Sequence, residues 1–383
     1  MGYRSMTRSP PRASDQPRHV LVPRFFDFGN TNAQNLNAKA LLRRFRAPDI
    51  AWTGTYYSAP DPQIAARPSI RLVRLWRHRF WHVRMFLLYL NGTDAVFYPG
   101  VGEADRIGIR MRDVLRGRTP VVGTLEGLVG DAKREATLTE WAGHEVCCQR
   151  VSQRQFRRAE FILQRADHVI AISPFLAEMG RRLYGDKVSM IPLGIDTTMF
   201  FPSGIRRRRE RQRVVCAGTV TAQKRPGFFV EIAGCFPQAD FIWYGDGPMM
   251  DEVRGSAAAI SARNVSFAGK ASPETLGQEF RDADLFIMPS KAEGVPKVSQ
   301  EAAACGLPQV IFGTYRSPSV IDGVNGYSVW SDEAFISRTA DLLADDAKAR
   351  RMGEAGATLA REWDWESVAP RWEEAVTRVV SQS

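Results

Sequence analysis

Two successive series of short apolar segments, separated by segments with helical character, place the strongest constraint on the fold of this chain. The first series lies at 19–26, 50–57, 94–100, 119–127, 166–173 and 188–196. The second lies at 213–220, 239–247, 264–270, 283–290, 308–313 and 326–330. Short apolar strands that alternate with helices are typical of parallel sheets buried on both faces. The 383 residues therefore predict an α/β protein with two open sheets, one in each of two domains.

The segment between the two series has the composition of a linker. It contains proline, glycine and the charge run IRRRRERQR (205–213), without hydrophobic periodicity. The predicted organisation is a disordered lead-in at 1–18, a first domain at 19–197, a linker at 198–213 and a second domain at 214–363. The terminal segment 364–383 carries apolar residues three or four positions apart, which predicts a helix whose stripe covers another surface. These residues are Trp365, Val368, Trp372 and Val376.

Composition excludes several classes of protein. The chain is 44% apolar and 25% charged, as in soluble globular proteins. No apolar run reaches the ~20 residues that span a bilayer. Basic residues at the N-terminus have no apolar segment behind them, so no secretory signal is expected. The five cysteines lack disulfide or metal spacing, which fits a reducing cytosol.

The net charge of +10 admits several anionic partners. In segment 71–86, RLVRLWRHRFWHVRMF, arginines alternate with Leu, Trp and Phe. One interpretation is a solvated face, and the other is a basic amphipathic helix that lies on anionic lipid. A nucleic-acid partner is not expected, because the arginines gather at the linker and one helix and no nucleic-acid motif is present.

The stretch EGVPKVSQE (293–301) predicts one end of a ligand site. Pro296 suits the first position of a helix, so Lys297 and Val298 would carry unpaired N–H groups at an anion-binding helix end. Glu301 would lie about 7.5 Å along the axis. Since a carboxylate inside a phosphate site would repel the phosphate, Glu293 and Glu301 fit better as hydroxyl acceptors on either side of it. The alternative is a surface helix with solvated glutamates.

Two further loops follow predicted strands. In CAGTVTAQKRP (216–226), a turn at Gly218 leads to Lys224 and Arg225, and a lysine there could neutralise a diphosphate. The alternative is an ordinary exposed lysine on a turn.

The loop in FDFGNTNAQN (26–35) would face the same cleft. Gly29 permits close approach of a substrate, and Asn30 and Asn32 could donate or accept hydrogen bonds on the acceptor side. A simple turn explains the loop equally well.

Several motifs occur in the order found in one enzyme family. They are ADHVIAIS, IPLGIDTTMFFP, CAGTVTAQK, WYGDGP, FAGKAS, EGVPKVSQEAAACGLPQV, VIDGVNGYSV and WDWESVAPRWEEAV. Residues 166–383, and more loosely the first half, resemble a retaining glycosyltransferase of the GT-B fold, family GT4. The resemblance implies two Rossmann-like domains that face each other across a cleft, with 364–383 crossing back onto the first. It also implies a UDP- or GDP-sugar donor, with neither cofactor nor metal required.

The resemblance assigns roles to residues of the second domain. Glu301 would bind the ribose and Glu293 the transferring sugar. Segment 268–271 would pass near the base. Lys224 and the amides near Lys297 and Val298 would hold the diphosphate. The full set of donor-binding candidates also contains Gly218, Thr219, Arg225, Gly269, Lys270 and Gly294.

The chain departs from the family pattern at three positions. Thr219 stands in place of an arginine, for which Arg225 or Lys297 would compensate, and Ser319 stands in place of an acidic residue. The family's first-domain histidine is absent, and Glu126 of TLEG stands there. Glu126 would take over a sugar or acceptor contact. His144 is the other catalytic candidate, with a structural role as its alternative.

Two other sets of residues have a structural interpretation. His168 lies at the start of a predicted strand. Asp282 and Asp284 lie at the edge of the sheet opposite the phosphate, so we do not expect them to hold a metal.

The resulting hypothesis is a retaining glycosyltransferase, with Glu293, Lys224, Glu126 and His144 as catalytic candidates. Its acceptor is a hydroxyl group, on a lipid-linked molecule if 71–86 meets a membrane, in glycan, polysaccharide or glycolipid synthesis. The expected location is the cytoplasm, with attachment to the inner face of the membrane if 71–86 contacts lipid. The alternative, motivated by Thr219 and Glu126, is an inactive GT-B protein that binds a nucleotide or a partner.

Overall fold

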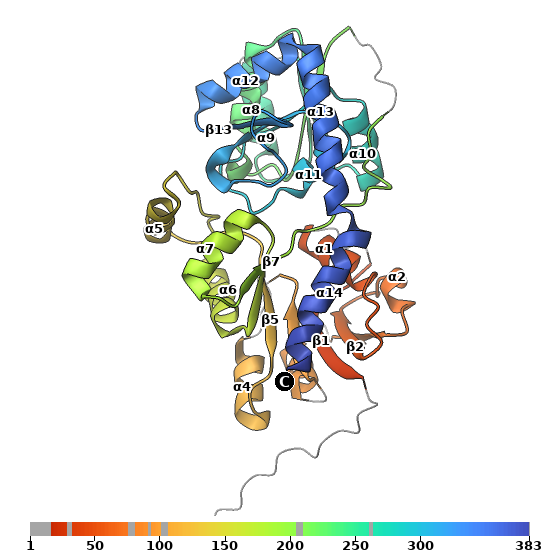
Figure 1. Cartoon of the computed structure of the whole chain (residues 1–383). Helices are drawn as coiled ribbons and strands as arrows, with labels where there is room; N and C mark the ends of the chain where they lie inside the picture. Colours follow the sequence, from red (N-terminus) through yellow and green to blue (C-terminus); the bar gives the residue numbers. More distant parts are fainter. Residues whose placement is uncertain are drawn as a thin grey trace, which may run out of the picture.

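The computed structural model describes residues 17–28, 33–75, 81–90, 93–100, 106–203, 210–259 and 263–382. The chain forms two lobes, one above the other in Figure 1, each built on its own parallel sheet. The expected lead-in at 1–18 lies almost wholly outside the described residues, as does most of the run 205–213.

The first lobe contains a seven-stranded sheet in the order β3-β2-β1-β4-β5-β6-β7. Its strands are β1 (Arg18–Phe25), β2 (Ile50–Tyr56), β3 (Ile70–Arg74), β4 (Ala95–Tyr98), β5 (Val121–Leu125), β6 (His168–Ala171) and β7 (Val188–Met190). Its helices are α1 (Ala33–Leu42), α2 (Pro62–Ala65), α3 (Trp81–Leu90), α4 (Arg106–Arg116), α5 (Ala132–Ala142), α6 (Gln153–Arg165) and α7 (Pro174–Tyr184). Strands β4 and β5 are buried at every residue, which explains their continuous apolar runs.

The second lobe contains a six-stranded sheet in the order β10-β9-β8-β11-β12-β13. Its strands are β8 (Arg213–Ala217), β9 (Asp240–Tyr244), β10 (Val265–Gly269), β11 (Leu285–Met288), β12 (Gln309–Phe312) and β13 (Gly326–Val329). Its helices are η2 (Ala222–Lys224), α8 (Pro226–Cys235), α9 (Met250–Ala259), α10 (Pro273–Arg281), α11 (Lys297–Ala304), η3 (Gly313–Tyr315), α12 (Asp332–Ala344) and α13 (Asp346–Ala360). All six strands lie within the segments expected from the sequence. Arg213 had been counted in both the linker and the first of these segments, and it belongs to β8.

Each sheet has a point at which the strand order reverses. These points lie between β1 and β4 in the first lobe and between β8 and β11 in the second. Ligands of open α/β sheets bind beyond the carboxyl ends of the strands at such points. The loops that follow β8 and β11 are joined there, because the Gln223 side chain donates to Ala292 O at 2.5 Å and Ser290 Oγ donates to Gln223 O at 3.1 Å.

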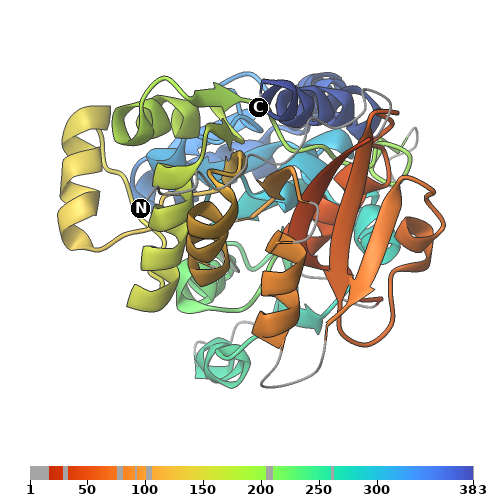
Figure 2. The ribbon, with the colours of Figure 1, turned by 90° about the horizontal axis from the view of Figure 1, so that it is seen from below.

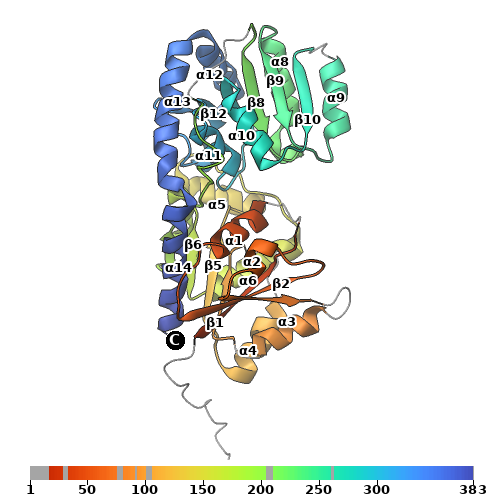
Figure 3. The same cartoon turned by 90° about the vertical axis from the view of Figure 1, so that its right-hand side faces the viewer.

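The chain crosses back to the first lobe at its C-terminal end. Helix α13 runs through η4 (Arg361–Trp363) into α14 (Trp365–Ser381), which lies along the first lobe in Figures 2 and 3. The expected apolar stripe of α14 is buried, and Trp372 Nε1 donates to Pro192 O at 2.8 Å. Glu373 accepts the backbone N–H groups of Arg46 and Ala47 at 2.8 and 2.6 Å. The predicted crossover helix is therefore confirmed.

One of the two interpretations of segment 71–86 is wrong. It is not a single basic amphipathic helix, because its first residues belong to edge strand β3 and its last to α3. In β3, Ile70 and Val73 are buried, whereas Arg71 and Arg74 are exposed. Residues 76–80 lie outside the described residues. The first part of the segment is extended because β3 pairs with β2 over five residues.

A smaller difference concerns Pro296. It caps α11 from outside, with φ of −68° and ψ of 105°, and Lys297 is the first helical residue. Among the described residues, no helix is long and apolar enough to cross a membrane.

Candidate active site

A cavity of about 460 Å³ lies between the two lobes at the carboxyl ends of their strands. Eight of the residues expected in the site line it: Glu126, Gly218, Thr219, Lys224, Glu293, Gly294, Lys297 and Val298. Five of them follow β8 or β11, Lys297 and Val298 are the first two residues of α11, and Glu126 follows β5 of the other lobe. The fold therefore brings together residues that lie far apart in the chain.

Lys224 and Glu293 form the ionic centre of this cavity. Lys224 Nζ lies 2.5 Å from Glu293 Oε1, and the two side chains are 18% and 8% exposed. Gly218 has a φ of 152°, and a Cβ there would lie 3.6 Å from Lys224 Cε. The open turn at Gly218 thus leaves room for a ligand beside the ammonium group.

Helix α11 begins at the cavity wall. Its first two amides, those of Lys297 and Val298, have no intrahelical partner and lie at the positive end of the helix. Burial lowers the pKa of Lys297. Burial also raises the pKa of Glu301, and the charge of Lys297 one turn away opposes that rise. The helix thus offers an anion a cationic end with one buried carboxyl group behind it.

Lys297 also connects the two lobes. Its Nζ donates to Asn37 Oδ1 of α1 at 3.1 Å and lies 5.5 Å from the centre of a Trp365 ring at the start of α14. A backbone contact reinforces this connection, because a Cβ on Gly294 would lie 1.7 Å from the carbonyl oxygen of Glu126. The lobes touch at the floor of the cavity.

A polar network of the first lobe holds Glu126. Gln34 Nε2 donates to Glu126 Oε2 at 2.6 Å, and Gln34 Oε1 accepts from Arg24 Nη2 at 2.8 Å. Arg24, 1% exposed, also donates from Nε to Asn35 Oδ1 at 2.7 Å. Burial raises the pKa of Glu126 to about 7, against the opposing effects of Arg24 and Gln34. Glu126 can therefore change charge near neutral pH.

Other expected donor-site residues lie elsewhere. Arg225 pairs with Asp332 through both terminal nitrogens, at 3.1 and 2.6 Å, and its guanidinium group stacks 4.3 Å from the Phe228 ring. Gly269 ends β10 with a φ of 77°, and Lys270 beside it is exposed. These three residues and Glu301 are not among those that line the cavity. The acceptor-side candidates Gly29, Asn30 and Asn32 lie outside the described residues.

His144 occupies a different contact between the lobes. Its ring lies 4.9 Å from Trp330 of the second lobe and 5.7 Å from Phe175 of the first. Its Nδ1 is 3.0 Å from Glu145 O. His144 does not line the cavity, so its geometry is that of a packing residue.

The residues with a structural interpretation have structural partners. His168 Nε2 lies 2.8 Å from Ser189 Oγ, and Asp284 Oδ2 accepts from Arg213 N at 2.8 Å. Ser319 is buried between Ser299 Oγ at 2.7 Å and Ser317 Oγ at 2.6 Å. In the described part of the chain, no group of three or more His, Cys, Asp or Glu side chains could hold a metal ion.

Sequence reasoning missed the first-lobe wall of the cavity. Gln34, Asn37, Gln149 and Gln155 line it, and none was a candidate. One signal was present: Arg24 interrupts the apolar run of β1, and an arginine inside a buried strand needs a polar network around it.

Comparison with known proteins agrees with this architecture. Residues 68–199 match the family model Glycosyltransferase Family 4, and residues 211–345 match the model Glycosyl transferases group 1. Together they cover more than half of the chain. A GDP-mannose-dependent alpha-(1-6)-phosphatidylinositol monomannoside mannosyltransferase of Mycolicibacterium smegmatis is 28% identical over 82% of this chain and 85% of its own length.

Solved structures show the same fold. Sucrose-phosphate synthase from Thermosynechococcus elongatus superposes with a TM-score of 0.75 at 20% identity, over 96% of this chain and 100% of that one. Anabaena HepE in complex with UDP-glucose gives 0.72 at 16% identity, over 94% and 99%. The two matching family models and the two-lobed fold lead to one conclusion: this chain is a group 1 glycosyltransferase of family GT4, a nucleotide-sugar enzyme with the GT-B fold.

Proposed function

We propose that the enzyme transfers a hexosyl group from a nucleotide-diphosphate sugar to a hydroxyl acceptor, with retention of the anomeric configuration. The observation that carries this proposal is the convergence of Lys224, Glu293 and the start of α11 on one side of a cavity that Glu126 closes from the other lobe. Cations and helix dipoles on one wall fit a diphosphate, and carboxylates fit sugar hydroxyl groups.

The second lobe binds the donor in this proposal. Lys224 and the first amides of α11 hold the diphosphate, Glu293 contacts the transferring sugar, and Glu301 accepts hydrogen bonds from the ribose. Lys297 supplies the cationic charge that the family arginine would supply at Thr219, because Arg225 is engaged by Asp332. Both GDP- and UDP-sugars are candidate donors, since one relative is named for GDP-mannose and one structural neighbour holds UDP-glucose.

Departure of the diphosphate is the step that needs stabilisation. As the glycosidic bond breaks, negative charge grows on the leaving phosphate oxygen, and preorganised N–H donors and the Lys224 ammonium group lie where that charge develops. We propose that the reaction requires neither a cofactor nor a metal. Glu126, held by Gln34, orients the sugar or the acceptor hydroxyl from the first lobe.

The acceptor binds in the first lobe and, we propose, is attached to a lipid. Helices α3 and α4 pack together and expose five large apolar side chains, among which Val114 is 85% exposed. These residues are Val83, Leu87, Met111, Val114 and Leu115. Exposed Arg110 lies beside them, and apolar side chains with basic neighbours fit an anionic lipid surface. This face, to which only the end of segment 71–86 contributes through Val83, is the proposed membrane contact on the cytoplasmic side.

A donor screen tests the proposed reaction. Transfer from GDP-mannose, UDP-glucose and other GDP- and UDP-sugars is followed by mass spectrometry, and the anomeric configuration of the product is read by NMR. The Glu301→Gln and Glu301→Ala variants should weaken nucleotide binding about tenfold or more, since a carboxylate bonded to hydroxyl groups contributes roughly 1.5–3 kcal/mol. The exposed Glu252→Ala variant is the matched control. Unchanged nucleotide affinity in both Glu301 variants would contradict the assignment.

The membrane contact is tested separately. Sedimentation with phosphatidylglycerol liposomes should fall in a Val114→Asp/Leu115→Asp variant and persist in an Arg371→Ala variant on the exposed side of α14. Sedimentation that does not depend on anionic lipid would reject the contact without affecting the proposed chemistry.

A further inference from the structure

A second cavity lies in the second lobe, at the two places where the chain passes between the lobes. Its volume is about 460 Å³, equal to that of the active-site cavity. The linker forms one wall with Pro202 and Ser203, and α13 with Arg361 of η4 forms another. The turn after α11, with Cys305 and Leu307, closes the base.

This cavity is distinct from the active site. Helix α11 has its first residue, Lys297, in the active-site cavity, and the turn that follows its last residue lines the second one. Eight residues of helix span about 12 Å. The turn packs closely against α13 there, because a Cβ on Gly353 would lie 2.0 Å from Gly306 O.

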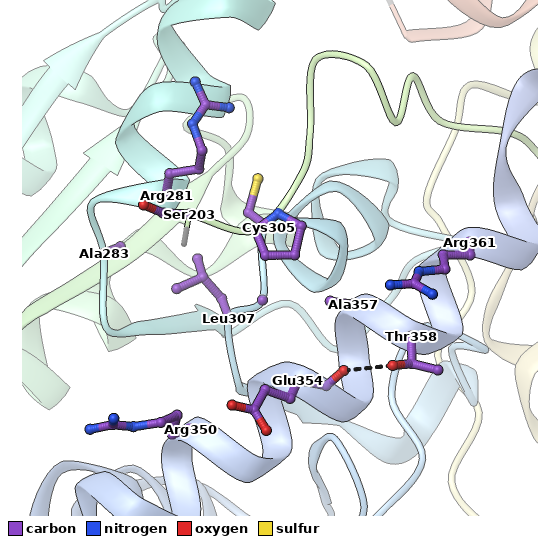
Figure 4. Close-up of a pocket in the computed structure, with 12 residues that line it drawn as sticks. Ser203, Arg281, Ala283, Cys305, Leu307, Arg350, Glu354, Ala357, Thr358 and Arg361 are labelled. Carbon is purple, nitrogen blue, oxygen red and sulfur yellow. Dashed lines mark hydrogen bonds between the residues drawn. The ribbon is translucent and has the colours of Figure 1, made fainter. Parts of the chain in front are cut away.

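The polar groups of the cavity are mainly cationic. Figure 4 shows Arg281 on one side and Arg350, Glu354 and Arg361 along α13 and η4 on the other. The spacing of Arg350, Glu354, Ala357 and Arg361 places them on one side of α13 and its C-terminal end, next to the face that packs on the lobe. Three guanidinium groups and one carboxylate leave a net positive charge in the cavity.

These guanidinium groups retain donors for a ligand. Arg281 Nη1 donates to Met199 O at 2.9 Å and its guanidinium group stacks 4.4 Å from the Phe201 ring, which fixes its position while leaving further N–H groups unused by the described residues. Arg350 pairs with Asp346 at 2.7 Å, in a pair about 60% exposed on each side, which water screens. The Arg361 side chain has no hydrogen bond or ion pair with the described part of the chain.

We propose that this second cavity binds a small phosphorylated polyol. Its phosphate contacts Arg281, Arg350 and Arg361, and its hydroxyl groups contact Glu354 and Thr358. Arginine forks match phosphate oxygens, whereas a carboxylate within the same cavity favours hydroxyl groups and disfavours a bare polyanion. Thr358 Oγ1 donates to Glu354 O at 3.0 Å, which holds its hydroxyl oxygen as an acceptor beside the cavity. A ligand in this cavity contacts both segments that connect the lobes, the linker at Pro202 and Ser203 and η4 at Arg361.

Calorimetry with glycerol 3-phosphate, and with glycerol as the neutral control, tests the site. Glycerol 3-phosphate should bind the wild-type enzyme and the Lys224→Ala variant alike. An Arg350→Ala/Arg361→Ala variant should bind at least about tenfold more weakly, because a hydrogen bond to a charged group contributes roughly 1.5–3 kcal/mol. The Arg351→Ala variant, exposed on α13 but outside the cavity, should bind as the wild type does.

Three results would overturn the proposal. They are the absence of binding to the wild type, unchanged binding in the double arginine variant, and loss of binding in Lys224→Ala, which would assign the phosphate to the active-site cavity. Circular dichroism of the double variant verifies folding, which the exposed position of both arginines favours.

Discussion

At the scale of single residues, Lys224 has the clearest expected effect. The Lys224→Ala variant should lose about 100-fold or more in kcat, because it removes the charge that faces the leaving diphosphate and leaves Glu293 unpaired. Steady-state kinetics with the best donor measures the effect. Lys133→Ala, at an exposed lysine of α5 outside the cavity, is the control and should stay within about twofold.

Glu126 carries a prediction about pH. Its pKa is raised from an ordinary value of 4.5 to about 7, so activity that needs the carboxylate should rise with pH through about 7. The Glu126→Gln variant keeps the contact with Gln34 as an amide and should lose this inflection in the profile of kcat/KM. The same inflection in the variant would show that another group titrates.

The stability of the enzyme should depend on the same group with a definite sign. Between pH 4.5 and 7 the folded enzyme keeps a proton on Glu126 that the unfolded chain has released. The free energy of unfolding therefore falls as pH rises through that interval. Denaturant unfolding at several pH values should show a shallower decline in Glu126→Gln than in the wild type.

At the scale of elements, α14 determines the stability of the first lobe although it follows the second lobe in sequence. Trp372 is fully buried, and its ring lies 6.2 Å from that of Phe97 in β4. The Trp372→Ala variant should lose about 3–5 kcal/mol of unfolding free energy, measured by denaturant titration. Arg371→Ala, exposed on the same helix, should change it by less than about 0.5 kcal/mol. A loss of unfolding free energy in Trp372→Ala as small as that in Arg371→Ala would mean that α14 contributes little to the core.

At the scale of the whole molecule, the contact of the two lobes depends on Gly294. Because a Cβ there would collide with the Glu126 carbonyl across the cleft, Gly294→Ala should hold the lobes apart and lower kcat/KM. Small-angle scattering should give a larger radius of gyration than for the wild type. Gly227→Ala, where a Cβ meets nothing within 4 Å, is the matched control. An unchanged radius with normal activity would show that the contact is not needed.

The sequence was sufficient for most elements because apolar periodicity is a local property. Every strand of the second sheet and the buried stripe of α14 were predicted correctly from it. It failed at 71–86, where a short edge strand and the start of a helix share one run of alternating arginines and apolar residues. A strand of five residues gives too short a pattern to distinguish from a helix.

For the candidate active site, the sequence by itself determined that Gly218, Lys224, Glu293 and the start of α11 gather at one edge, because they follow strands of one sheet. Only the tertiary structure decided which cations remain for the ligand: Arg225 pairs with Asp332, whereas Lys297 reaches Asn37 of the other lobe. It also decided the environment of Glu126, which Arg24 and Gln34 set. Strand ends are encoded locally, but the partner of a charged side chain depends on how distant segments meet.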